Sequence, residues 1–176
     1  TIDKSVQEII KRKLIAGVEK YKAKEGCVVV VQPATLEILG LTCIPDFDPE
    51  TYYKYDESYY KNGAISSLYE PGSTFKPFVM AAAINEGVLK PDSLFDEIGQ
   101  VSVGEYNIKT WNDKYEGKIT MTRVLEKSSN VGMVYVGEKL GNKKLLEYIK
   151  NYGFGDLTGI DLQGEVPGYL RPTNEW

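Results

Sequence analysis

The sequence contains no histidine, and this absence excludes a large class of catalytic chemistry. Without an imidazole, the chain cannot assemble a Ser-His-Asp triad from its own residues. Cysteine is also scarce: Cys27 and Cys43 are the only two, and no Cys-x-x-Cys pair occurs. Because imidazole and paired thiolates are the usual zinc ligands, we expect no metal site, and no pattern in the chain predicts a cofactor.

Long apolar runs and an excess of basic charge are absent as well. No stretch approaches the roughly 20 apolar residues needed to cross a bilayer, and no signal peptide is recognisable. The net charge is −4, from 21 basic and 25 acidic residues. This balance argues against a nucleic-acid partner, which would require a basic face. The hydrophobic content of 42% is enough for a real core, and 176 residues make one domain or a large part of one.

Residue periodicity predicts an α+β fold, with helices packed around an antiparallel sheet. Thr1 or Asp3 is expected to cap the first helix, Thr120 and Asn142 two later ones, and Gly87, Gly141 and Gly153 to end helices. Between 44 and 70 we expect a long loop whose tyrosines anchor it, with a substrate groove as the alternative role. The predicted elements are a helix over 3–23, a hairpin over 27–42, a helix after Ser73, a hairpin over 101–108, and helices over 120–127, 130–139 and 142–152.

The two cysteines fall on the two strands of the first predicted hairpin. A disulfide between Cys27 and Cys43 is compatible with an oxidising compartment. The alternative is a pair of small apolar side chains in a sheet. Since the register of the strands cannot be read from the sequence, we favour the second interpretation.

A serine and a lysine stand three residues apart at the start of an apolar helical stretch, in the segment Glu70-Pro71-Gly72-Ser73-Thr74-Phe75-Lys76-Pro77. Residues at this spacing share a helix face, so the Lys76 amine can approach the Ser73 hydroxyl. A serine nucleophile needs an adjacent base, and lysine is the substitute when histidine is absent. The simpler interpretation is that Ser73 only caps the helix. A second match, Ser58-Tyr59-Tyr60-Lys61, has no apolar helix after it, and we regard it as a chance occurrence.

A second hydroxyl and an amide follow 52 residues later, in Ser128-Ser129-Asn130. Placed between two predicted helices, these groups can complete a Ser/Lys site, or they can form a plain helix cap. Ser-x-x-Lys followed by Ser-x-Asn is the motif order of penicillin-binding proteins and serine β-lactamases.

The wider context resembles the class B penicillin-binding proteins, in family order from about Gly26 onward. The matching segments are Asn62-Gly63-Ala64-Ile65, the stretch from Glu70 to Pro77, Lys127-Ser128-Ser129-Asn130-Val131-Gly132, Tyr152-Gly153-Phe154-Gly155, Thr158-Gly159-Ile160-Asp161-Leu162 and Gly164-Glu165. The resemblance implies the transpeptidase fold that this family shares with the serine β-lactamases. It also implies a D-Ala-D-Ala transpeptidase that cross-links peptidoglycan and is acylated by penicillins.

The resemblance assigns roles to individual residues. Ser73 is the nucleophile, Lys76 its base, Ser128 a proton relay and Asn130 a holder of Lys76 and of the substrate amide. Trp111 and Thr74 are placed among the substrate-binding residues, and for Trp111 a place in the core is the alternative.

The third motif of the family, Lys-Thr-Gly, does not occur, and Lys109-Thr110 is followed by Trp111. We therefore expect residues 1–176 to be the N-terminal part of a single, incomplete transpeptidase domain. The implied partners are peptidoglycan stem peptides, β-lactams, the C-terminal half of the domain and a membrane glycosyltransferase. The implied location is the extracytoplasmic face of the bacterial cytoplasmic membrane. Two alternatives remain: a serine β-lactamase or β-lactam sensor, and a non-catalytic scaffold that needs a complementing chain.

Overall fold

The computed structural model describes residues 2–172. The described residues divide into two compact units, one formed by 2–68 and 157–167 and the other by 69–156 and 168–172. Each unit therefore combines segments that are far apart in the sequence. Within the described residues, no helix is both long and apolar enough to span a membrane.

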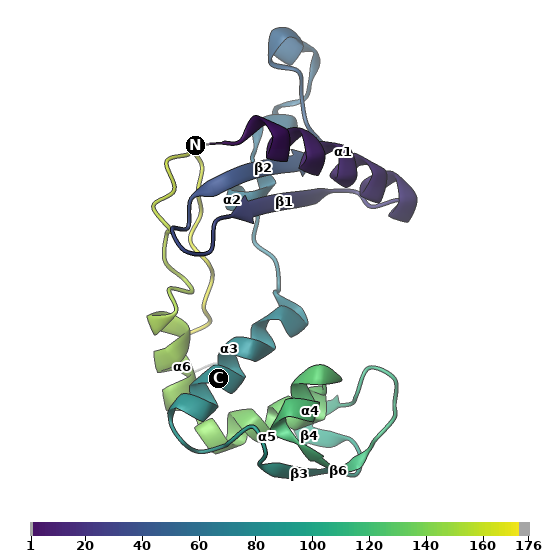
Figure 1. The fold of residues 1–176 in the computed structure, drawn as a ribbon, viewed down its shortest axis with the longest axis vertical. Helices are drawn as coiled ribbons and strands as arrows, with labels where there is room; N and C mark the ends of the chain where they lie inside the picture. The colour runs from purple at the N-terminus through teal and green to yellow at the C-terminus, as the bar shows by residue number, and fades with distance from the viewer. Residues whose placement is uncertain (1, 173–176) are drawn as a thin grey trace. The chain divides into compact units, whose positions relative to one another are not determined.

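The first unit is built from a helix packed on a two-stranded hairpin (Figure 1). The helix α1 (Lys4–Tyr21) begins at Asp3, whose side chain accepts a hydrogen bond from the Val6 N–H, and the strands are β1 (Gly26–Val31) and β2 (Ile38–Ile44). The Gln7 amide holds both backbone groups of Leu41, with distances of 2.9 and 2.7 Å. The predicted first helix and hairpin are thus confirmed, and Asp3 is the capping residue.

The hairpin register settles the state of the two cysteines. Cys27 lies directly opposite Cys43, and the two residues form a disulfide. Our preference for two unbonded residues was wrong, because it depended on a register that only strand pairing fixes. The turn between the strands places Leu36 at φ 60°, a left-handed conformation that usually favours glycine.

The segment between 44 and 70 is less irregular than predicted. It contains the 3-10 helices η1 (Pro49–Lys54) and η2 (Glu57–Tyr60) and the short helix α2 (Gly63–Ser66). The Tyr60 ring packs edge-on against Phe47 at 5.1 Å, and its hydroxyl donates to the Tyr52 carbonyl at 2.8 Å. These contacts support the prediction that the tyrosines anchor the loop.

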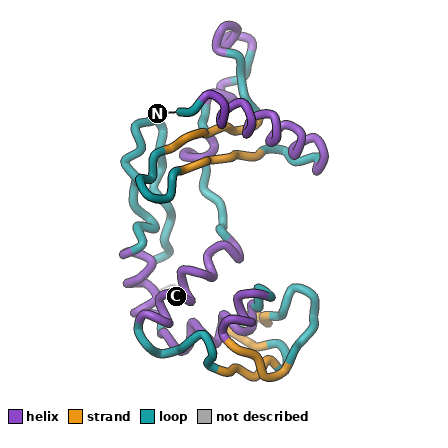
Figure 2. Tube along the Cα trace, viewed as in Figure 1, coloured by secondary structure: helices purple, strands orange, loops and turns teal. Residues whose placement is uncertain are grey.

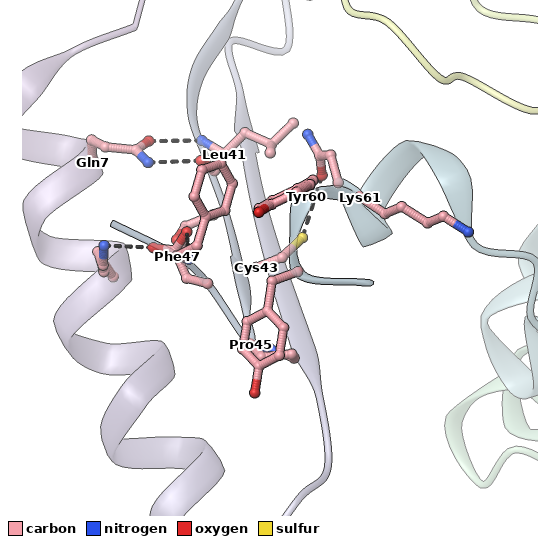
Figure 3. Close-up of a pocket in the computed structure, with 12 residues that line it drawn as sticks. Gln7, Leu41, Cys43, Pro45, Phe47, Tyr60 and Lys61 are labelled. Carbon is pink, nitrogen blue, oxygen red and sulfur yellow. Dashed lines mark hydrogen bonds and ion pairs between the residues drawn. The ribbon is translucent and has the colours of Figure 1, made fainter. Parts of the chain in front are cut away.

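A pocket of the first unit is lined by α1, β2 and this loop (Figure 3). An ion pair between Lys11 Nζ and Asp46 Oδ2, 2.6 Å apart, lies at its edge. Its lining includes none of the residues that we predicted as site residues.

The second unit combines helices with two small antiparallel pairs of strands (Figure 2). The strands are β3 (Leu94–Glu97) paired with β6 (Gly117–Thr120), and β4 (Val101–Val103) paired with β5 (Tyr106–Ile108). The helices are η3 (Gly72–Phe75), α3 (Lys76–Asn85), α4 (Met121–Glu126), α5 (Asn130–Leu140) and α6 (Asn142–Asn151). Their shared core consists of Met80, Ala83, Leu89, Ile119, Met121, Val124 and Val136.

The predicted α+β class is confirmed, with two local differences in this unit. The sequence did not predict β3 and β6, two four-residue strands without a clear alternation. The start of α6 also differs: Gly141 occupies the N-cap position, and no side chain caps the helix. Asn142 is therefore the first helical residue rather than the cap.

Candidate active site

Ser73 lies in the 3-10 turn η3, immediately before the helix that carries Lys76. Gly72 at φ 57° starts the turn, and the Lys76 N–H donates to the Ser73 carbonyl. The N-cap positions of η3 and α3 are occupied by Pro71 and Phe75, without a side-chain capping bond. Among residues 2–172, the exposed Ser73 hydroxyl has no hydrogen-bond partner. The interpretation of Ser73 as a simple helix cap is therefore wrong.

Lys76 joins the two sequence motifs. Its Nζ donates to the Ser128 carbonyl at 2.7 Å, to the Ser128 hydroxyl at 3.0 Å and to Asn130 Oδ1 at 2.7 Å. All three acceptors come from residues 52 and 54 positions further along the chain. The structure thus brings together Lys76, Ser128 and Asn130, three of the four residues that we predicted as catalytic. The fourth, Ser73, lies in η3, three residues before Lys76.

Burial lowers the pKa of the Lys76 amine from its ordinary value, because a partly desolvated ammonium loses hydration. A lower pKa increases the fraction of neutral amine near neutral pH. That shift is in the direction required of a base.

Ser128 adopts a left-handed backbone with φ 56°. This conformation costs a residue with a Cβ atom roughly 1–2 kcal/mol. It persists where surrounding contacts impose it, and such residues cluster at functional sites. Here it directs both the carbonyl and the hydroxyl of Ser128 to the same ammonium.

Asn130 is the first residue of α5 and connects Lys76 to a third segment. Its Oδ1 accepts from Lys76, while its Nδ2 donates to the Lys109 carbonyl at 2.9 Å. Two residues beyond Lys109, the Trp111 side chain is 76% exposed, so the alternative of a core tryptophan is wrong. The Thr74 hydroxyl donates to the Pro71 carbonyl at 2.6 Å, and its role toward substrate stays a prediction.

A buried carboxylate lies behind the Ser128–Asn130 segment, and no sequence pattern predicts it. Glu97, at the end of β3, is fully buried and accepts from Lys127 Nζ at 2.5 Å, from Ser129 Oγ at 2.5 Å and from the Glu116 N–H at 3.2 Å. Burial alone would raise the pKa of Glu97, but these three donors outweigh it and lower the pKa below the ordinary value.

The second Ser-x-x-Lys match is of a different kind. Ser58 lies in η2 of the first unit, where its N–H donates to the Asp56 side chain at 2.9 Å. Lys61 follows the end of that turn, in an extended conformation. Because η2 is not continued by an α-helix, this match does not share the helical setting of Ser73 and Lys76.

Comparison with known proteins identifies the family. Residues 26–176 match the family model described as penicillin binding protein transpeptidase domain. The chain is 43% identical over 175 residues to stage V sporulation protein D of Bacillus subtilis (strain 168), covering 98% of this chain and 27% of that protein. It is 34% identical over 182 residues to a peptidoglycan D,D-transpeptidase FtsI homolog of Mesostigma viride, covering 99% of this chain and 30% of that protein.

A solved structure shows the same fold. A crystal structure of a peptidoglycan glycosyltransferase from Burkholderia ambifaria superposes with a TM-score of 0.85 at 29% sequence identity, covering 99% of this chain and 51% of that one. The chain therefore spans about a third or less of these two curated relatives and about half of this solved chain.

Proposed function

The chain belongs to the penicillin binding protein transpeptidase domain family, and from this membership we propose that it forms part of a D-Ala-D-Ala transpeptidase. The enzyme cross-links peptidoglycan through an acyl-enzyme on Ser73. The observation that carries the proposal is the set of bonds from Lys76 Nζ to Ser128 and Asn130. These bonds join the Ser-x-x-Lys and Ser-x-Asn motifs of the family in one site.

The first half of the reaction forms an ester on Ser73. The neutral Lys76 amine takes the proton of the Ser73 hydroxyl, and Oγ attacks the carbonyl between the two D-alanines. The Ser73 N–H is one donor for the oxyanion that develops. As the amide C–N bond breaks, the Ser128 hydroxyl passes its proton to the leaving amine and takes a proton from the Lys76 ammonium, which becomes neutral again. The terminal D-alanine departs.

The second half of the reaction transfers the acyl group. The amine of a second stem peptide attacks the ester carbonyl and gives up a proton to Lys76 by way of the Ser128 hydroxyl. The bond to Ser73 Oγ then breaks, and the Lys76 ammonium passes a proton to Oγ. The products are a cross-linked peptide and the free enzyme. Penicillins are proposed to acylate the same serine and to remain attached as a stable adduct.

Asn130, Trp111 and Thr74 are the proposed substrate contacts. The Asn130 amide holds Lys76 through Oδ1, and the same side chain is proposed to meet the substrate amide. Trp111 exposes a large apolar ring three residues after the end of β5, which suits it to line the peptide. Thr74 directly follows the nucleophile on the exposed side of the turn.

We propose that residues 1–176 are the N-terminal part of one transpeptidase domain, which works with the C-terminal half that carries the third motif. Each compact unit is formed by two stretches that are far apart in the sequence, so the chain passes from one unit to the other and back. This arrangement supports a single domain. The location proposed is the extracytoplasmic face of the bacterial membrane, and the Cys27–Cys43 disulfide supports an oxidising compartment. A membrane glycosyltransferase of the wall machinery is the proposed protein partner.

Intact-mass spectrometry of the full-length protein that carries this sequence, after incubation with a penicillin, tests the proposal. We expect an adduct equal to the mass of the drug. It should be absent in Ser73→Ala and retained in Ser58→Ala, which removes the hydroxyl of the other Ser-x-x-Lys match.

The outcomes separate the alternatives. Rapid turnover of the drug without a lasting adduct would indicate a β-lactamase instead. A folded protein that forms no adduct would favour the alternative of a non-catalytic scaffold that needs a complementing chain. An adduct that survives in Ser73→Ala would remove Ser73 from the mechanism.

A further inference from the structure

We propose that Glu97 is a positioning residue: its buried carboxylate fixes the Lys127–Asn130 segment so that Ser128 and Asn130 meet Lys76. This inference rests on the proposed function, because it assigns a role within that same site. Glu97 itself touches none of the proposed reacting groups.

The contacts along four consecutive residues alternate between two anchors. Lys127 and Ser129 bond to the Glu97 carboxylate, each at 2.5 Å. The residues that alternate with them, Ser128 and Asn130, bond to Lys76. Two residues of the segment are therefore held from behind while the other two face the amine.

The chemistry of Glu97 indicates a specific role. A carboxylate without exposure is costly unless donors satisfy it, and here both oxygens are engaged. The Lys127 side chain, 10% exposed, supplies the opposite charge. Apolar side chains often stabilise a buried position as well as an ion pair does, so stability alone does not explain a buried ion pair here. A polar network in which every group has a partner fixes the geometry of its members, and we assign that role to Glu97.

Ser129 transmits this anchor to the start of α5. Its hydroxyl donates to Glu97 and accepts from the Gly132 N–H at 2.9 Å, so it caps the helix. A Cβ atom at Gly132 would lie 2.7 Å from two methyl carbons of the buried Val124. The helices α5 and α4 are therefore packed too closely at this point to admit a side chain. The position of Asn130, the first residue of α5, thus depends on β3.

The left-handed backbone of Ser128 needs such an anchor. An αL serine persists only when its surroundings over-determine it, and Ser128 is held on both sides by residues bonded to Glu97. Releasing either neighbour would allow Ser128 to relax toward an ordinary backbone conformation and move its hydroxyl relative to Lys76.

The test measures penicillin acylation of the full-length protein in Glu97→Gln and Ser129→Ala. Progress curves separate the non-covalent binding constant from the acylation rate constant, and the final adduct gives the number of active sites. We expect the rate constant per active site to fall at least tenfold in both variants, since small displacements of catalytic groups slow chemistry strongly. The non-covalent binding constant should change less than threefold.

The matched control is Glu116→Gln. The Glu116 carboxylate also contacts Lys127, at 3.5 Å, but it does not reach Ser129. This variant should keep an acylation rate constant within twofold of the wild type. An unchanged rate constant per active site in both Glu97→Gln and Ser129→Ala would overturn the proposal, even if their thermal stability fell.

Hydrogen exchange supplies a readout that does not depend on catalysis. We expect Glu97→Gln and Ser129→Ala to lose amide protection within residues 127–132, with α3 unaffected. If the wild type formed no adduct, the proposed function would fail, and exchange would still decide whether Glu97 holds the segment. Unchanged protection of residues 127–132 in both variants would refute that role.

Discussion

At the scale of single residues, Lys76 combines partial burial with three hydrogen-bond acceptors. The acceptors orient the amine toward the Ser128–Asn130 segment, while burial disfavours its charged form. The balance of these effects determines how much neutral amine is present for Ser73.

The pH dependence of acylation should report this balance. Because burial lowers the Lys76 pKa, the neutral base accumulates at lower pH than it would for an ordinary lysine, whose pKa is about 10.4. The acylation rate constant should therefore rise about tenfold per pH unit below the lowered pKa and reach half of its plateau at a pH below that ordinary value. Stopped-flow acylation with a penicillin across neutral to alkaline pH measures the profile.

The control for this profile is Lys76→Arg, which keeps the positive charge but cannot lose its proton. We expect its acylation rate constant to fall at least about 100-fold at every pH, the usual loss when a general base is removed. A variant with near-normal rates would contradict the role of Lys76 as base.

The backbone of Ser128 yields a stability prediction. Ser128→Gly and Ser128→Ala both remove the hydroxyl, but only glycine relieves the left-handed conformation at φ 56°. The glycine variant should have a free energy of unfolding higher by about 1 kcal/mol than the alanine variant. Urea denaturation of both variants measures the difference. Equal stabilities would mean that the serine backbone is not strained.

At the scale of secondary-structure elements, α5 is the helix on which the site depends, because it starts at Asn130 and packs against α3 and α4. Its two internal glycines differ in their surroundings. Gly132 is buried against Val124, whereas nothing lies within 4 Å of a Cβ atom built at Gly137.

Alanine substitutions at these two positions should have opposite effects. Gly137→Ala should stabilise the protein by about 0.5–1 kcal/mol, because alanine loses less backbone freedom in a helix. Gly132→Ala should destabilise it by about 1–3 kcal/mol through overpacking against Val124. Thermal unfolding of the two variants provides the comparison. A stabilising Gly132→Ala would show that α5 is not packed as described.

At the scale of the whole molecule, the covalent cross-link and the candidate site belong to different compact units. The Cys27–Cys43 disulfide closes the hairpin of the first unit, whereas Ser73, Lys76, Ser128 and Asn130 all belong to the second. Changes at the disulfide should therefore be measured first as changes in the stability of the first unit.

Removing the disulfide should destabilise that unit. Its cysteines are separated by 16 residues, a loop whose closure is worth about 3 kcal/mol in the unfolded chain. The double variant Cys27→Ala/Cys43→Ala should lose amide protection across residues 26–44. Wild-type protein in reductant should behave like the variant, and the variant should not respond to reductant. A variant with wild-type protection would show that the bond does not contribute.

Features that depend on neighbouring residues could be predicted from the sequence alone. Asp3 and Thr120 cap helices because a short polar side chain reaches the N–H three residues on. A spacing of three placed Ser73 and Lys76 on one turn for the same local reason. The predicted helices, the two hairpins and both motifs of the site followed from such patterns.

The tertiary fold set what lies opposite these elements. It paired Cys27 with Cys43, supplied Lys76 with acceptors 52 and 54 residues away, exposed Trp111 and buried Glu97 behind Ser129. Glu97 belongs to no sequence motif, and the paired strands β3 and β6 show no clear alternation of apolar and polar residues. These features depend on strand register and long-range packing, which local residue patterns do not encode, and so they became visible only when distant segments met.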